Sequence, residues 1–417
     1  MVAFHFPPQA ASSGIQRTLS FTRHLGSHDW EPLVLSANPL AYEHKNSSQL
    51  ANVPHDMIVE RPFTLDAKRH MAIAGRYPEV LALPDRWISW WLSAFPVGLS
   101  MIRKYKPSLI WSTFPIATAH LIGLSLHRFT GLPWVADFRD PMLQSLFPAT
   151  QLQRKTYSWI ENQSIINCSK AVFTTQSAMD SYKRRFAEHF HDKFIIIENG
   201  YDEDDFSSIN MNRSNPSLNK NKCITLLHSG LLYTPGRDPS ALFQAINTLK
   251  TQGRINATQL SVTLRAPGDI NFFKSLTNKY NIEDIVNIAP SIPYQEALHE
   301  MLAVDGLLVF QGTQFNSQIP AKIYEYFRTR KPIFSLLDQL GETAKVLQAA
   351  GFHNMASLDS AETILPALES FILQIQNGSA YKASDEIVER SSRKNRTNEL
   401  AKIFNQVTDL TREKRIS

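Results

Sequence analysis

The chain has 417 residues, of which 43% are hydrophobic and 19% charged, a composition typical of globular proteins rather than disordered or fibrous ones. This length exceeds one ordinary hydrophobic core and predicts two domains of about 200 residues. The formal net charge of +5 does not indicate nucleic-acid binding, although a mild basic excess fits an anionic substrate or membrane surface.

The cysteines and the apolar runs bear on the compartment. Cys168 and Cys223 lack the spacing of a metal site and fit a reducing compartment. The first residues contain no signal-peptide pattern, and no run of about 18 apolar residues is available to cross a bilayer. We therefore expect a cytoplasmic protein.

The first half of the chain alternates short apolar runs with helix-length amphipathic segments. This alternation predicts a parallel sheet with helices on both faces. A polar, Asn- and Ser-rich stretch at 202–222 then interrupts the pattern and predicts an interdomain linker. The apolar runs span residues 2–6, 32–36, 109–113, 134–138, 171–175 and 194–198.

The second half resumes the same alternation. The fold class predicted is α/β, with two doubly wound Rossmann-like domains at 1–205 and 220–382, and a charged final helix at about 383–417 that packs back on the first domain. Two such domains facing each other place a ligand in the cleft outside the carboxyl ends of the strands. Dinucleotide enzymes, periplasmic receptors and GT-B glycosyltransferases share this outline, so the fold alone does not select a function. The apolar runs here span residues 223–230, 260–268, 286–290, 305–310 and 331–337.

The first turn between strand and helix is "FPPQAASSGIQRTL". Small residues at 10–14 allow a tight turn that brings backbone amides towards a ligand, which makes Gly14 and Arg17 candidates for a phosphate or acceptor loop. The turn is not a G-x-G-x-x-G motif, which argues against a nicotinamide cofactor. An ordinary tight turn explains these residues equally well.

Three charges end the strand in "PWVADFRDP". Asp137, Arg139 and Asp140 are expected where the cleft of an α/β protein opens, and three charges in four positions favour a reaction centre. A structural Arg–Asp pair is the alternative. The acidic "ENGYDEDDF" that follows later has no His or Cys companion and is read as a solvated turn, not a metal site.

Two segments of the second half carry candidate ligands of a phosphate and a sugar. In "LLHSGLLYTPGRDPSALFQAI", Arg237 precedes a helix and could meet an anion there, or could be a surface arginine beside Asp238. In "QFNSQIPAKIYEYFRTRKPIF", Pro320 opens a helix that presents Lys322, Glu325 and Thr329 on the face opposite its apolar residues. A carboxylate there suits sugar or ribose hydroxyls and the lysine suits a phosphate, whereas a plain helical Lys/Glu pair is the alternative.

The segment "DRWISWWLSAFPVGLSMIRKYKP" combines three tryptophans with three cations. Such a helix either lies on an anionic membrane, which would fit a lipid-linked glycan acceptor, or packs its tryptophans in the core, which is the more common use of an amphipathic helix. Both interpretations stay open. The residues are Trp87, Trp90, Trp91, Arg103, Lys104 and Lys106.

Taken together and in this order, these segments resemble the retaining, nucleotide-sugar-dependent glycosyltransferases of GT-B fold, family 4, in a bacterial branch of the cell-surface polysaccharide type. The resemblance rests on "FPPQAASSGIQRTLSFTRHLGSHDWEPLVL", "PSLIWSTFPIATAHLIGLSLHRFTGLPWVADFRDP", "ENGYDEDDF", "HSGLLY" with "GRDP", and "FNSQIPAKIYEYFRTRKPIF", and spans nearly the whole chain. It implies sugar transfer from a nucleoside diphosphate to a glycan or lipid-linked glycan acceptor, with retention and without a metal or other cofactor.

The resemblance also implies roles for particular residues. Glu325 would bind the donor ribose, and Lys322 with Arg237 the diphosphate. Arg139 and Asp140, with Asp137 beside them, would lie at the reaction centre, where family members commonly have His-Asp. The chain departs from the family with Ser317 in place of a first glutamate, Leu231 in place of an arginine, and a single glycine in the first loop. The remaining donor-side candidates are Gly230, Ser317 and Ile319.

Two other functions remain open: a non-catalytic subunit that binds a nucleotide sugar, which Ser317 and Leu231 allow, and a nucleotide-sugar 2-epimerase of similar fold. The epimerase would need a cluster of carboxylates and histidines that the sequence does not display. The predicted enzyme is a metal-independent, hexosyltransferase-type glycosyltransferase in bacterial surface glycan synthesis, cytoplasmic or peripheral on the inner face of the plasma membrane.

Overall fold

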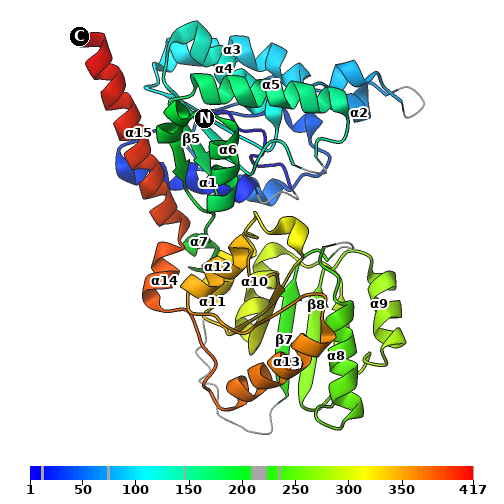
Figure 1. Cartoon of the computed structure of the whole chain (residues 1–417). Helices are drawn as coiled ribbons and strands as arrows, with labels where there is room; N and C mark the ends of the chain where they lie inside the picture. Colours follow the sequence, from blue (N-terminus) through cyan, green and yellow to red (C-terminus); the bar gives the residue numbers. More distant parts are fainter. Residues whose placement is uncertain (11–13, 73–75, 145–146, 208–222, 233–235, 417) are drawn as a thin grey trace. The chain divides into compact units, whose positions relative to one another are not determined.

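The computed structural model describes residues 1–10, 14–72, 76–144, 147–207, 223–232 and 236–416. The chain forms two compact units, Met1–Asn199 with Arg393–Ser417, and Gly200–Ser392 (Figure 1). From the sequence, the first domain was expected to end at residue 205, and the chain was expected to return to it at about residue 383. In the structure the chain passes from the first unit to the second between residues 199 and 200, and back between residues 392 and 393. Part of the predicted linker, 208–222, lies outside the described residues, and Glu203–Ser207 form the short helix α7.

The first unit is built on parallel strands. Val2 bridges Leu35 on one side and Ser112 on the other, so it joins a pair of strands to a group of four. The resulting order is β2, β1, Val2, β3, β4, β5, β6. The strands are β1 Val34–Leu35, β2 Val59–Glu60, β3 Ile110–Thr113, β4 Trp134–Arg139, β5 Lys170–Phe173 and β6 Phe194–Ile196.

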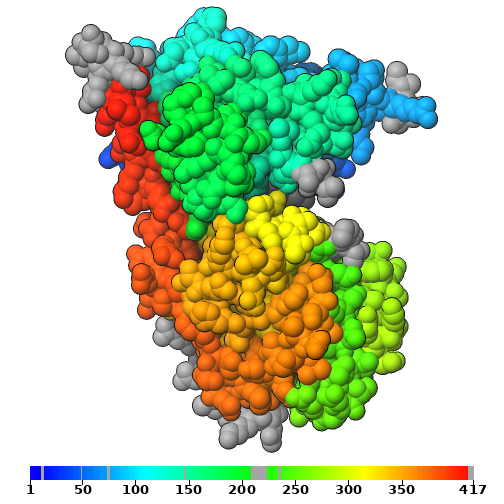
Figure 2. Space-filling view, viewed as in Figure 1, coloured from blue at the N-terminus to red at the C-terminus, as the bar shows by residue number. Residues whose placement is uncertain are grey.

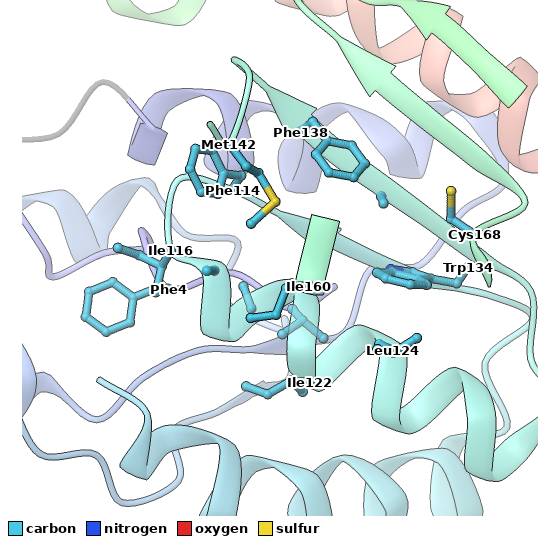
Figure 3. Packing of buried hydrophobic residues seen from close by; sticks show 14 of the residues in the cluster. Phe4, Phe114, Ile116, Ile122, Leu124, Trp134, Phe138, Met142, Ile160 and Cys168 are labelled. Atoms are coloured by element: carbon cyan, nitrogen blue, oxygen red, sulfur yellow. The ribbon is translucent and has the colours of Figure 1, made fainter. Parts of the chain in front are cut away.

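Helices cover this sheet and bury its apolar residues. Figure 3 shows side chains from α4, β4 and α5 in one cluster, among them Ile122, Trp134 and Ile160. The last helix, α15, belongs to the same unit and packs Leu400, Phe404 and neighbouring side chains against α1 and the strands; it runs along the surface of the unit in Figure 2. The helices are α1 Gly14–His24, α2 Ala67–His70, α3 Ser89–Tyr105, α4 Ala117–Thr130, α5 Gln151–Asn167, α6 Gln176–Arg185 and α15 Arg393–Ile416.

The tryptophans of helix α3 and of the segment before it pack in the core, which is the second of the two interpretations of this segment. Trp90 is fully buried, and Trp87 and Trp91 pack against the same core. Trp91 also donates its indole N–H to Ser125 Oγ at 2.9 Å. These rings are therefore occupied in packing and do not form the exposed aromatic anchor that a membrane-surface helix needs. No helix among the described residues is long and apolar enough to span a bilayer.

The second unit has one parallel sheet in the order β12, β11, β10, β7, β8, β9. Strands β10 and β11 are buried along their whole length because helices cover both faces of the sheet. The strands are β7 Ile224–Ser229, β8 Leu260–Arg265, β9 Val286–Ala289, β10 Gly306–Gln311, β11 Ile333–Leu337 and β12 Met355–Ala356. The helices are α8 Ser240–Thr251, α9 Ile270–Lys279, α10 Tyr294–Ala303, α11 Lys322–Thr329, α12 Glu342–Ala349, α13 Ala361–Gln376 and α14 Asp385–Arg390.

Most predicted strands are confirmed, and the exceptions have physical reasons. The expected strand at 2–6 is reduced to a bridge at Val2, because the chain turns at Pro7 and Pro8. The two-residue edge strands β2 and β12 were missed, since two residues carry no readable alternation. The helix expected from 383 divides into α14 and α15, of which only α15 belongs to the first unit.

Candidate functional site

The second unit has a topological switch point between β7 and β10. The chain leaves β7 for β8 on one side, whereas β10 pairs with β7 on the other side. Loops that leave the carboxyl ends of two such strands diverge, and ligands of open parallel sheets bind in the crevice between them. Here those loops begin at Gly230 and Gly312.

Lys322, the first residue of α11, reaches the end of β7. Its Nζ donates to the carbonyl oxygen of Ser229 at 2.7 Å and lies 3.4 Å from His228 Nε2. Gly230 has φ +125°, and a Cβ on it would lie 2.8 Å from Lys322 Nζ. Glycine is therefore favoured here by its backbone conformation, and any side chain in its place would also displace the ammonium group.

The electrostatics around Lys322 favour an anion. Burial, together with the nearby positive charge of Arg237, lowers the pKa of Lys322 to about 7, although Glu325 acts in the opposite direction. Burial also lowers the pKa of His228 well below its usual range. Its Nδ1 lies 3.1 Å from the Leu308 carbonyl and donates to it, so Nε2 accepts from Lys322.

Arg237 lies on the loop after β7, beside the loop after β10. The amide of Gly312 donates to the carbonyl oxygen of Gly236 at 2.6 Å and joins the two loops. The Arg237 guanidinium carbon lies 5.6 Å from the centroid of the Phe315 ring, and Nη1 donates to the Leu231 carbonyl at 3.4 Å. Arg237 lies close enough to Lys322 for its positive charge to lower the pKa of the lysine.

Glu325 lies one turn into α11, on the same side as Lys322. Its Oε1 accepts from the Tyr294 hydroxyl at 2.8 Å, and that hydroxyl lies 3.4 Å from Asp205 Oδ2. Tyr294 is the first residue of α10 and thus orients the Glu325 carboxylate from a different helix. Glu325 is partly exposed, which leaves room for a ligand hydroxyl.

The other donor-side candidates lie on the loop before α11. Gln311 Nε2 lies within hydrogen-bond distance of the carbonyls of Phe315 and Gln318, at 2.9 and 2.8 Å, and so anchors this loop to β10. Ile319 is 8% exposed and belongs to the core of the unit, so its role is to anchor the loop. Ser317 remains partly exposed.

The opening of α11 differs from the prediction in two respects. The helix begins at Lys322, two residues after Pro320, and its first amides, those of Ile323 and Tyr324, bond to the carbonyls of the third residue before each. Thr329, expected on the exposed face, is 6% exposed, and its hydroxyl donates to the Tyr326 carbonyl.

Sequence reasoning missed His228, Tyr294 and Tyr326. Tyr326 is fully buried, and its hydroxyl lies 3.5 Å from the Ser229 amide and 3.4 Å from the Leu308 carbonyl, so it braces α11 against β7 and β10. His228 could have been found, because a histidine inside an otherwise apolar run just before a glycine is unusual. No local pattern indicates the Tyr294–Glu325 pairing, which is a tertiary contact.

In the first unit, Arg17 and Asp137 form a buried structural pair. Arg17 Nε and Nη2 donate to the two carboxylate oxygens of Asp137 at 2.9 and 3.1 Å, and Arg17 also donates to the carbonyls of Glu198 and Ile197. Their side chains are 5% and 0% exposed. Both side chains therefore hold α1 to the sheet, and the carboxylate expected at the reaction centre and the guanidinium expected in a phosphate loop are engaged by each other.

Arg139 and Asp140 follow at the carboxyl end of β4. Burial raises the pKa of Asp140, an effect that Arg139 and Arg17 oppose. Burial, together with the nearby positive charge of Arg139, lowers the pKa of His5 to about 3. Gly14 is buried at the start of α1, whereas residues 11–13 of the predicted loop lie outside the described residues.

A cavity of about 630 Å³ also lies in the first unit, lined by apolar side chains such as Leu33 and Phe404 and by polar and charged ones such as Asp409. It lies at the amino ends of β1 and β3, opposite the edge at which parallel sheets bind ligands. The cavity is thus separate from Arg139 and Asp140.

No protein-family model and no curated protein sequence matches the chain. Its structure is similar to that of HepE from Anabaena in complex with UDP-glucose, with a TM-score of 0.64 and 12% identity over 97% of this chain and 99% of that one. WaaG, a glycosyltransferase involved in lipopolysaccharide biosynthesis, gives 0.60 and 12% over 97% and 99%. A UDP-N-acetylglucosamine 2-epimerase gives 0.51 and 11% over 92% and 90%.

These likenesses, at low identity, establish the fold. The chain has the GT-B fold, with two Rossmann-like domains. The GT-B expectation from the sequence is thus confirmed.

Proposed function

We propose that this protein is a glycosyltransferase that moves a sugar from a nucleoside-diphosphate sugar to an acceptor hydroxyl, with retention of anomeric configuration. The observation that carries the proposal is the position of Lys322, Arg237 and Glu325 around Gly230 at the switch point of the second unit. A diphosphate needs cations, and a ribose needs a hydrogen-bond acceptor; this place offers both.

In this proposal the donor binds with its diphosphate against Lys322 and Arg237. The leaving diphosphate gains negative charge as the glycosidic bond breaks, and fixed cations in a dry site stabilise that charge without a metal. Glu325, held by Tyr294, accepts hydrogen bonds from the ribose. Gly230 and the loop of Ser317 and Ile319 supply the backbone around the donor. HepE has been solved with UDP-glucose, which supports a nucleotide sugar as the donor class.

Arg139 and Asp140 are proposed to contact the acceptor or the reacting sugar from the first unit. The phosphate of the leaving group can itself take the acceptor proton, so the mechanism needs no separate base. We further propose that the enzyme is a hexosyltransferase of bacterial surface glycan synthesis in the cytoplasm. The similarity to WaaG, which is involved in lipopolysaccharide biosynthesis, supports this role by analogy.

A nucleotide-sugar 2-epimerase and a non-catalytic binder remain the alternatives. The epimerase shares the fold, but it would need acid and base groups near the sugar, and Glu325 is already engaged by Tyr294. A pure binder would have the donor site without turnover. Hydrolysis of the donor in the absence of acceptor separates an enzyme from a binder.

The test is a thermal-shift screen of the wild type, Glu325→Ala and the control Glu283→Ala against UDP-, GDP- and dTDP-sugars. Glu283 is exposed and lies before β9, away from the switch point. A ligand at 100 times its dissociation constant stabilises the native state by about 2.7 kcal/mol. We expect one nucleotide class to stabilise the wild type and the control but not Glu325→Ala. Absence of any shift in the wild type would overturn the proposal.

A further inference from the structure

Two arginines of the first unit are buried without a matching acceptor. Arg139 is 9% exposed and Arg393, the first residue of α15, is 5% exposed. Arg139 Nε and Arg393 Nη1 are buried, and no described residue accepts a hydrogen bond from either atom. Among the described residues the Arg139 side chain makes one hydrogen bond, from Nη1 to the Phe114 carbonyl, and it is long at 3.4 Å.

Such groups are costly unless something pairs with them. A buried charge is normally paired or bound to a ligand, because its removal from water is unfavourable unless other groups replace the lost hydration. Two other buried arginines of the same unit have carboxylate partners: Arg17 is paired with Asp137, and Arg396 with Glu198 and Glu399. Arg139 and Arg393 are exceptions within the described residues.

The charges around Arg139 are out of balance. Arg17 and Arg393 both act on it as positive neighbours, and Asp140 and Asp137 as negative ones. Because Asp137 is already bonded to Arg17, only Asp140 is left to balance two guanidinium groups, and no ion pair joins it to either within the described residues. One anionic group bound here would restore the balance.

The backbone is shaped to present Arg139. The register of β4 with β5 shifts between Asp137 and Arg139, and Arg139 has φ +61°, a left-handed conformation that is unfavourable for a side chain of this size. Thr174 holds the carbonyl of Arg139 with its amide and its hydroxyl, at 3.0 and 2.9 Å. Strain of this kind, maintained by neighbouring bonds, is concentrated at binding sites.

We propose that Arg139 and Arg393 bind an oxyanion, a phosphate or a carboxylate, carried by the acceptor, so that the acceptor is an anionic glycan or glycan precursor. The identity of the ligand as acceptor rests on the proposed function; the anion site does not. Guanidinium groups bind both oxyanions through paired N–H groups.

The test titrates the full chain with inorganic phosphate or with glucuronate, against sodium chloride at equal ionic strength, and follows the melting temperature. Variants are Arg139→Gln, Arg393→Gln and, in the donor site, Arg237→Gln. The control is Arg254→Gln, which removes one positive charge from a partly exposed pair with Glu369 in the second unit.

We expect one oxyanion to stabilise the wild type, Arg237→Gln and Arg254→Gln, with apparent affinity at least tenfold weaker in Arg139→Gln and Arg393→Gln. Equal stabilisation of all variants, or none beyond that of chloride, would overturn the site. If a Gln variant fails to melt cooperatively, the Lys variant at the same position, Arg139→Lys or Arg393→Lys, replaces it. A lysine retains the positive charge but lacks the paired N–H groups of a guanidinium. Weakened binding of the oxyanion is therefore still expected.

A saturating nucleotide identifies the source of the anion. If the oxyanion and the nucleotide stabilise additively, the site belongs to the acceptor, as proposed. If the nucleotide abolishes stabilisation by the oxyanion, the site binds the donor diphosphate and the acceptor assignment is wrong. If no nucleotide binds, the proposed function fails while the oxyanion titration still decides the anion site.

Discussion

Lys322 Nζ donates to the carbonyl oxygen of Ser229 at 2.7 Å and so joins the first turn of α11 to the end of β7. The residue that follows β7 is Gly230, and a Cβ there would lie 2.8 Å from the same nitrogen, so a side chain at this position would force the ammonium group to shift. The ammonium group is thereby held at the carboxyl end of β7 before any ligand arrives.

The first prediction concerns Gly230→Ala. The added methyl group displaces Lys322, so we expect affinity for a nucleotide sugar to fall at least tenfold, as measured by calorimetry. Gly253→Ala is the control, because Gly253 also has a positive φ, +68°, but nothing lies within 4 Å of the place that its added methyl group would occupy. Both variants lose roughly 1 kcal/mol or more of stability from the backbone conformation. Equal affinities in the two variants would contradict the role of Gly230.

The second prediction concerns pH. The pKa of Lys322 is about 7 in the folded protein, against an ordinary lysine value of 10.5, so the unfolded chain binds more protons between these values. The contribution of Lys322 to the free energy of unfolding therefore rises with pH from about 7 to 10.5. Affinity for a diphosphate changes in the opposite sense: it is greatest below about pH 7, where the amine is charged, and falls above it.

The measurement is affinity for a nucleotide sugar between about pH 6 and 9, in the wild type and in Lys322→Met. A nucleotide sugar is used because its diphosphate has no ionisation in this range. We expect the pH dependence to disappear in Lys322→Met, together with the rise in stability above about pH 7. The same slope in both proteins would show that another group is responsible.

The third prediction concerns Tyr294 and Glu325. Because the Tyr294 hydroxyl donates to Glu325 Oε1 at 2.8 Å, Tyr294→Phe should weaken nucleotide binding about three- to tenfold, the effect of about one hydrogen bond. In a Glu325→Gln background the same change should have little effect, since the two residues act through one contact. Additive losses would show that Tyr294 does not act through Glu325.

The sequence predicted the parts of this molecule that depend on local pattern. Apolar runs located most strands, and the spacing in α11 placed Lys322 and Glu325 on one side. The sequence could not show which charged side chains form structural ion pairs within the fold. Asp137 and Arg17 are 120 residues apart, and only tertiary structure shows that they bond to each other while Arg139, two residues from Asp137, does not. The proximity of Arg393 to Arg139 was missed for the same reason, because it too depends on tertiary structure.

The last prediction separates a structural from a catalytic Asp137. Asp137→Ala leaves Arg17 buried without its carboxylate, which should lower the free energy of unfolding by about 3–5 kcal/mol. Glu369→Ala breaks the more exposed pair with Arg254, in which the Arg254 and Glu369 side chains are 39% and 31% exposed, and should cost about 0–1 kcal/mol. Urea unfolding measures both. If Asp137→Ala instead unfolds like the wild type while sugar transfer is abolished, Asp137 acts in catalysis and its assignment as a structural residue is wrong.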